Sequence, residues 1–97
     1  MLYQVKITSF ANEIGKKFSP DIKNAAKVAL KELAQNPTLG KELQEELSGF
    51  RSYRFMRYRI IYKIATQEKH IIVWAIGHRR DIYENFNSLL LKQNVEG

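Results

Sequence analysis

The chain has 97 residues, of which 44% are hydrophobic and 27% charged, and 16 Lys and Arg against ten Asp and Glu give it a formal net charge of +6. Because a single hydrophobic core serves roughly 50 to 200 residues, this length fits one domain over residues 1–97 and excludes a multidomain enzyme. The absence of cysteine excludes disulfides, thiolate metal sites and cysteine nucleophiles. Neither a signal-peptide pattern nor an apolar run near the roughly 18 residues that span a bilayer is present, so we expect a cytoplasmic protein with no membrane segment.

The first 36 residues predict a strand followed by two helices. Residues 2–7 alternate between apolar and polar side chains and are rich in β-formers, which indicates a short strand. Apolar residues then recur every four positions over residues 9–18, as on one face of a helix. A second helix should begin at Ser19, whose side-chain oxygen can accept amide protons and which is followed by Pro20 and Asp21. We expect it to end at the Asn36-Pro37 break.

The second half predicts a sheet and a closing helix. Residues 37–50 are polar with spaced leucines and suit a connecting loop with at most one helical turn. Three β-rich runs follow at residues 51–56, 58–64 and 70–76, and their hairpin-sized gaps favour an antiparallel meander. From Asp81 onward the apolar residues regain helical spacing, at Ile82, Tyr83, Phe86, Leu89 and Leu90. The predicted order is β-α-α-β-β-β-α, an α+β fold with a strand and helical hairpin packed on an antiparallel sheet.

The positive charge is concentrated on this predicted sheet. Residues 51–80 hold six arginines and two lysines against one glutamate, a charge of +7, whereas residues 1–50 carry +1 and residues 81–97 carry −2. Strand alternation puts two sets of side chains on opposite faces of the 58–64 strand. One set is Tyr58, Ile60, Tyr62 and Ile64, and the other is Arg57, Arg59, Ile61 and Lys63. We expect the first face to be packed and the second to be cationic.

Arg54 and Arg59 should converge on the cationic face, with His78 and Arg79 arriving from the adjacent strand end. The alternative is that these arginines only solvate an exposed face of the sheet. A solvated face usually mixes charges of both signs, and this segment has almost no acidic residues, which favours a binding surface. Arginine suits phosphate because its planar fork donates two parallel hydrogen bonds and stays charged.

Proton transfer could come from His78 or Tyr83. Taken alone, such a histidine is more often a strand-end hydrogen bonder than a base, and such a tyrosine is more often a packing residue. We expect no metal or cofactor, since His70 and His78 lack a nearby carboxylate cluster and no glycine-rich phosphate loop is present. The remaining phosphate chemistry is attack by a ribose 2′-hydroxyl on the adjacent phosphodiester, which RNA allows and DNA does not. Arginines could stabilise the charge of that transition state.

Three segments resemble the RelE/ParE superfamily of toxins from type II toxin-antitoxin systems. They are Gly-Phe-Arg-Ser-Tyr-Arg at residues 49–54, Tyr-Arg-Ile-Ile-Tyr-Lys-Ile at residues 58–64, and Ile-Gly-His-Arg-Arg-Asp-Ile-Tyr at residues 76–83. The resemblance covers nearly the whole chain, and the order of elements in that family is the order predicted above.

The RelE branch of this superfamily implies a ribosome-dependent endoribonuclease, or mRNA interferase, that cuts mRNA in the ribosomal A site and inhibits translation. The implied partners are the ribosome with its mRNA and a cognate antitoxin, which silences the toxin in a hetero-oligomer. The family's catalytic positions fall here on Arg54, Arg59, Arg79 or Arg80, and Tyr83, and His78 stays a candidate because some relatives use histidine. We assign RNA binding to Arg51, Arg57 and Lys63.

Two departures from the family pattern affect this transfer of roles. Arg51 and Arg54 stand where some members have lysines, so a lysine proton shuttle is not available there. The spacing from Gly77 to Tyr83 is also shorter than in some members, which leaves the roles of Arg79 and Arg80 open. The alternatives are a ParE-like toxin that inhibits DNA gyrase without cleaving nucleic acid, or a degenerate module that only binds RNA or antitoxin. We favour the nuclease because the arginines, His78 and Tyr83 occur together.

Overall fold

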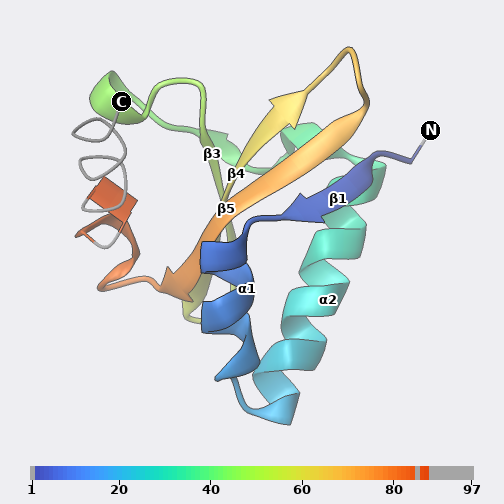
Figure 1. The fold of residues 1–97 in the computed structure, drawn as a ribbon. Coiled ribbons are helices and arrows are strands. Elements are labelled where there is room, and N and C mark those ends of the chain that lie inside the picture. Colours follow the sequence, from blue (N-terminus) through green and yellow to red (C-terminus); the bar gives the residue numbers. More distant parts are fainter. Residues whose placement is uncertain (1, 85, 88–97) are drawn as a thin grey trace.

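A five-stranded sheet with strand order β1-β5-β4-β3-β2 organises the computed structural model, which describes residues 2–84 and 86–87 (Figure 1). The elements are, in chain order, β1 (Gln4–Ile7), α1 (Ser9–Lys16), α2 (Pro20–Gln35), β2 (Lys41–Glu42), β3 (Arg51–Phe55), β4 (Tyr58–Ala65) and β5 (His70–His78). Short 3-10 turns at Pro37–Leu39 and Glu45–Leu47 flank β2. Residues 82–84 and 86–87 are helical, so the predicted closing helix does begin there, whereas Leu89 and Leu90 lie outside the described residues.

The strands β3, β4 and β5 form the predicted antiparallel meander, which confirms the α+β class. Strand β1 pairs in parallel with β5 and forms one edge of the sheet. Strand β2 forms the other edge through two pairs with β3. The sequence did not predict β2, because two residues are too few to show the alternation that marks a strand.

The two helices begin in different ways. The Thr8 side chain caps α1 by accepting a hydrogen bond from the Ala11 N–H at 3.3 Å. The predicted side-chain cap at Ser19 is wrong, since Ser19 makes no such bond. Helix α2 starts there nevertheless, because Pro20 presets the backbone angle of the first turn and Asp21 complements the helix dipole. Within the described residues, no helix combines the length and apolar character needed to cross a bilayer.

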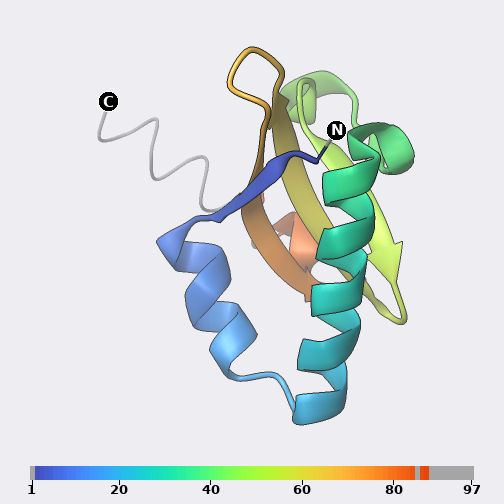
Figure 2. The same ribbon diagram turned by 90° about the vertical axis from the view of Figure 1, so that its right-hand side faces the viewer.

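Both faces of the sheet are packed. Figure 2 shows α1 and α2 together in front of one face, where they cover a core that includes Leu33, Ile60 and Val73. On the other face lies a smaller cluster, made of Phe50, Ile61, Ala75, Ile82 and Phe86. The expectation that the second face is cationic along its length is therefore wrong at its centre, because the segment after β2 and the residues after β5 bring apolar side chains onto it.

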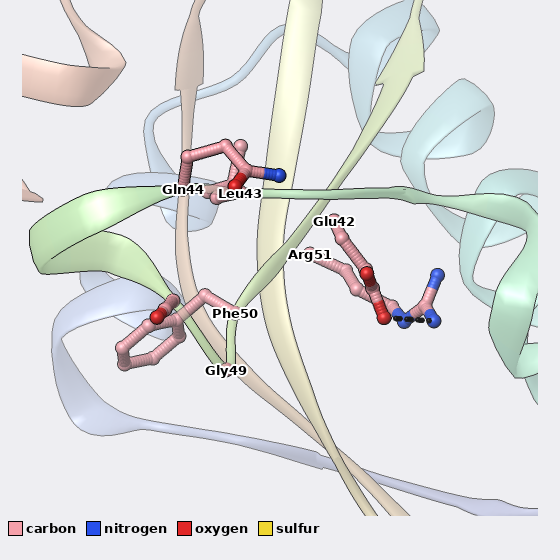
Figure 3. A pocket seen from close by; sticks show the side chains of 7 residues that line it. Glu42, Leu43, Gln44, Gly49, Phe50 and Arg51 are labelled. Carbon is pink, nitrogen blue, oxygen red and sulfur yellow. Dashed lines mark hydrogen bonds and ion pairs between the residues drawn. The ribbon is translucent and has the colours of Figure 1, made fainter.

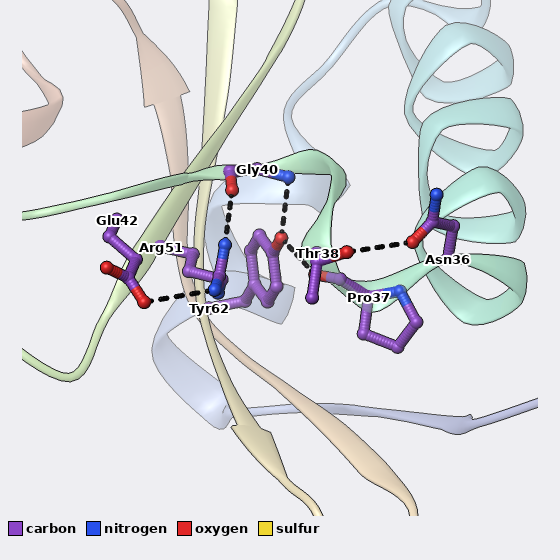
Figure 4. Close-up of polar contacts among 7 residues, drawn as sticks. All are labelled: Asn36, Pro37, Thr38, Gly40, Glu42, Arg51 and Tyr62. Atoms are coloured by element: carbon purple, nitrogen blue, oxygen red, sulfur yellow. Dashed lines mark hydrogen bonds and ion pairs between the residues drawn. The ribbon is translucent and has the colours of Figure 1, made fainter.

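Tyr62 ties the connection between α2 and β3 to the sheet (Figure 4). Its ring is fully buried, its hydroxyl donates to the Pro37 carbonyl at 2.6 Å, and it accepts from the Gly40 N–H at 2.9 Å. Gly40 must be glycine here, since any Cβ would overlap the Tyr62 hydroxyl. Arg51 adds hydrogen bonds to the Gly40 carbonyl at 2.7 Å and to the Glu42 carboxylate at 3.1 Å. The connecting segment is therefore fixed by two side chains of the sheet.

We expect Tyr62→Phe to destabilise the protein by about 1 to 3 kcal/mol, because it leaves the buried Gly40 N–H without a partner. Urea denaturation would measure the loss. The matched control is Tyr53→Phe, whose hydroxyl bonds Glu32 at the surface and whose removal should change stability by less than about 0.5 kcal/mol. Equal effects from the two variants would show that the Tyr62 hydroxyl does not anchor this segment.

The difference in stability between the wild type and Tyr62→Phe should depend on pH. Burial raises the pKa of Tyr62, although the Gly40 hydrogen bond and the Arg51 charge oppose this shift. The unfolded tyrosine ionises at its ordinary pKa of about 10, so the stability that Tyr62 contributes is complete below that pH and falls as the pH rises through the raised folded value. The stability advantage of the wild type over Tyr62→Phe should therefore narrow above about pH 10.

Candidate functional site

A two-residue turn fixes the register of the β3–β4 hairpin. Met56 and Arg57 form this turn, and Met56 has a φ of 52°, in the left-handed region. So short a connection leaves one register for the flanking strands. That register pairs Phe55 with Tyr58 and Arg54 with Arg59. Directly opposed residues of an antiparallel pair point to the same face, so the predicted convergence of Arg54 and Arg59 is confirmed.

Arg59 has no acidic partner among the described residues. Arg54 is exposed and Arg59 half-buried, and within residues 2–84 and 86–87 neither forms an ion pair with a carboxylate. The Arg59 Nε is buried and has no hydrogen-bond partner among the described residues, a state that it shares with the Trp74 indole nitrogen. A buried donor without a partner and a like-charged neighbour both destabilise the free protein. An anion in contact with both guanidinium groups would relieve the like-charge repulsion.

The Tyr83 ring lies against Arg59. Tyr83 belongs to the helical segment after β5, and the centroid of its ring is 6.0 Å from the Arg59 guanidinium carbon. Its hydroxyl donates to the Ser52 Oγ at 3.1 Å. Ser52, on β3, is only 5% exposed, and our sequence analysis missed it. Its position two residues before Arg54 is the available signal, since alternation puts both on one face.

The structure does not place His78 with these residues. His78 is paired with Tyr58 in the β4–β5 ladder, and the two rings meet edge to face at 5.7 Å, on the face that the helices cover. Its Nδ1 accepts a hydrogen bond from the Arg80 N–H at 3.2 Å. The expectation that His78 arrives beside Arg59 is wrong, because Gly77 is the residue opposite Arg59 and the next residue points to the other face.

The end of β5 brings two further arginines beside the hairpin turn. The Arg79 N–H donates to the Arg57 carbonyl at 2.9 Å, which extends the ladder by one bond. The side chains of Arg57, Arg79 and Arg80 are all exposed. Because Gly77 and His78 occupy opposite faces, alternation returns Arg79 to the Arg59 face. Arg79 is thus better placed than Arg80 to act with Arg59.

Two residues assigned to RNA binding lie away from this arginine pair. Arg51 is opposite Tyr62, on the face covered by the helices, and is 19% exposed where it bonds Gly40 and Glu42. It therefore has a structural partner set and does not share the face of Arg59. Lys63 does share that face, but its Nζ lies 4.5 Å from the centre of the Phe50 ring. Buried Ile61 stands between Lys63 and Arg59 along the strand.

A pocket of about 280 Å³ lies at the end of the sheet away from the hairpin turn (Figure 3). It is lined by Glu42, Leu43, Gln44, Ser48, Gly49, Phe50 and Arg51. The two charged residues of its lining, Arg51 and Glu42, form an ion pair with each other. Arg59 and Tyr83 do not line this pocket. We therefore place the candidate site on the face of the sheet that carries Arg54 and Arg59, which we call the arginine face. Among the described residues, no three His, Asp or Glu side chains gather as a metal site would require.

The arrangement of sheet and helices matches a known class of protein. The toxin-antitoxin complex RelBE2 from Mycobacterium tuberculosis matches 80% of this chain and 99% of its own with a TM-score of 0.75 and 30% identity. The intact RelBE complex of E. coli matches 78% of this chain and 95% of its own, with a TM-score of 0.69 and 15% identity. The chain has the RelE-like toxin fold.

Sequence comparison gives the family. The family model described as ParE toxin of type II toxin-antitoxin system, parDE, matches residues 6–83. Toxin RelG from Mycobacterium tuberculosis is 34% identical over 85 residues, which cover 86% of this chain and 98% of RelG. The chain belongs to the RelE/ParE superfamily of type II toxins, which confirms the resemblance seen in its motifs.

The unpartnered Arg59 leads to a stability prediction. We expect Arg59→Met to stabilise the free protein by about 1 kcal/mol, because it removes a cross-strand like charge and a buried donor without a partner. The gain should shrink as salt is added, since salt screens the repulsion. Chemical denaturation at low and high salt would measure it. The control Arg57→Met, in the exposed turn, should shift stability by less than about 0.5 kcal/mol. A loss of stability in Arg59→Met would mean that this arginine is fully accommodated in the fold.

Proposed function

We propose that this toxin is a metal-independent, ribosome-dependent mRNA endoribonuclease that acts in the cytoplasm and stops translation. The observation that supports it most directly is the half-buried Arg59, which has an unpartnered Nε, lies opposite Arg54 and contacts Tyr83. Two cations and a phenol at one point fit a phosphodiester, because arginine forks bind its oxygens and a phenol can exchange a proton with a substrate oxygen.

The proposed reaction is an intramolecular transfer within RNA. The ribose 2′-oxygen gives its proton to a solvent water and bonds to the adjacent phosphorus, and the bond from phosphorus to the 5′-oxygen breaks. Arg54, Arg59 and Arg79 stabilise the negative charge of the phosphorane. Tyr83 is the titratable side chain in contact with Arg59, and it donates a proton to the leaving 5′-oxygen. The products are a 2′,3′-cyclic phosphate and a 5′-hydroxyl end.

Two other functions compete with this proposal. The matching family model is named for ParE toxins, which favours a toxin that inhibits DNA gyrase by binding. A degenerate toxin that binds RNA without cutting it would also keep the arginines. Neither needs a tyrosine beside Arg59, and the contact between Tyr83 and Arg59 therefore favours the nuclease.

We expect Arg59→Ala to slow translation-dependent mRNA cleavage by about 10²- to 10³-fold, because it removes a preorganised charge from the transition state. Tyr83→Phe should slow it by about 10²- to 10⁴-fold, as expected for loss of a general acid. Cleavage mapping on programmed ribosomes, with analysis of the new ends for the cyclic phosphate, would measure both. Growth arrest on induction should disappear in the double variant.

The control for Tyr83→Phe is Tyr53→Phe, which removes a phenol hydroxyl that bonds Glu32, on the face covered by the helices. It should cleave and arrest growth like the wild type. Continued growth arrest by the Arg59→Ala/Tyr83→Phe double variant would contradict the nuclease. So would loss of DNA supercoiling with intact mRNA, which would indicate the gyrase inhibitor instead.

The second part of the proposal concerns the antitoxin. The related structures include complexes of toxin with antitoxin, and the arginine face here offers unpaired cations to such a partner. We expect the product of the adjacent gene to carry an acidic or amphipathic segment that covers this face or displaces the helical segment after β5. Complex formation should abolish cleavage.

Hydrogen exchange of the toxin with and without that protein would locate the contact. Protection should increase in the β3–β4 turn and in residues 79–84. Protection confined to the small groove between α1 and α2, which is lined in part by Ala11, Phe18, Ala26 and Leu30, would contradict this placement. Unchanged activity and solubility would contradict the partner itself.

A further inference from the structure

Ser52 is a buried polar residue whose contacts are not explained by the fold. It is 5% exposed and lies on β3, opposite Ile61, where its neighbours on the same face are apolar or cationic. An alanine would fill the same position in the strand without a hydroxyl to satisfy. The partner of that hydroxyl is the Tyr83 Oη at 3.1 Å, which comes from a segment 31 residues away. The contact therefore links the sheet to the start of the last helical segment.

This hydrogen bond and the Arg59 contact hold Tyr83 at two points. The ring lies over the Arg59 guanidinium, and the hydroxyl is held by Ser52. Ile82, the residue before Tyr83, is fully buried and fixes the backbone. A tyrosine side chain has two rotatable bonds, so a fixed backbone, a ring contact and one hydroxyl contact leave it a single orientation. Its oxygen is thereby kept on the arginine face.

We propose that Ser52 is a positioning residue that holds the Tyr83 hydroxyl at the phosphodiester bound by Arg59. This role rests on the proposed nuclease function. A serine hydroxyl suits it because it can both accept and donate. Ser52 accepts from Tyr83 in the free protein. When the Tyr83 O–H turns to the leaving oxygen, the Ser52 O–H rotates to donate to the Tyr83 oxygen, and it keeps that bond after the proton has moved. The contact thus persists through proton transfer, and the phenol does not swing away.

The test uses the rate of mRNA cleavage on programmed ribosomes at saturating and subsaturating toxin. We expect Ser52→Ala to lower the maximal rate by about 10- to 100-fold, because a displacement near 1 Å of a reacting group has an effect of that order. The toxin concentration for half-maximal rate should change by less than about twofold, since the phosphate-binding arginines are intact. Ser52→Thr and Ser52→Val form a matched pair of equal shape, of which only threonine keeps the hydroxyl and should keep most of the rate.

The double variant Ser52→Ala/Tyr83→Phe separates positioning from a structural role. If Ser52 acts through Tyr83, its loss should have no further effect when the Tyr83 hydroxyl is already gone. An equal slowing by Ser52→Ala in both backgrounds would overturn the proposal, as would equal rates for the threonine and valine variants. If Ser52→Ala is poorly folded, as thermal melting would show, the threonine and valine pair gives the answer. A wild type that fails to cleave mRNA would refute the nuclease itself, whereas a cleaving wild type matched by Ser52→Ala would refute the role of Ser52 alone.

Discussion

The two-residue turn between β3 and β4 is the constraint on which the candidate site depends. It leaves the hairpin one register, and that register puts Arg54 opposite Arg59. A shift by one residue would send one arginine to the face covered by α1 and α2, where apolar side chains pack. The pair is unfavourable in the free protein, since like charges face each other and the Arg59 Nε lacks a partner among the described residues. A local feature that opposes stability within a consistently packed fold is typical of a functional site.

Packing on both faces of the sheet turns this arginine pair into a site. The helices cover one face, and the apolar cluster on the other face stops short of the hairpin turn, where Arg54 and Arg59 remain. Gly77 contributes at this point, because a Cβ there would come within 3.0 Å of the Ile82 side chain. Its absence lets the segment after β5 lie close to the sheet and brings Tyr83 over Arg59. The same packing therefore determines both the fold and the position of the phenol.

Alternation and short gaps in the sequence were sufficient to predict the meander, the face shared by Arg54 and Arg59, and the start of the last helix. These patterns did not predict the face on which His78 lies, because that face depends on where β5 ends. Strand β5 runs to His78, two residues beyond the predicted end, which puts His78 in register with Tyr58. The apolar cluster beside Lys63 and the hydrogen bond between Ser52 and Tyr83 both join segments distant in the chain. Such contacts depend on the path that the segments before β3 and after β5 take across the sheet. A local pattern of residues does not predict that path.

In the proposed function, substrate and antitoxin gain binding free energy from the same interaction, which is neutralisation of Arg54 and Arg59. Either a phosphate group or a carboxylate placed between Arg54 and Arg59 would neutralise the like charges. Among the described residues, no carboxylate neutralises this pair in the free protein. Each partner would therefore gain from neutralising the repulsion, in addition to its own contacts. Because one anion at a time can occupy that position, neutralisation by an acidic antitoxin segment and binding of the RNA backbone would exclude each other. In the proposed function, the arginine pair that binds the RNA backbone is thus also the pair through which the antitoxin blocks RNA binding.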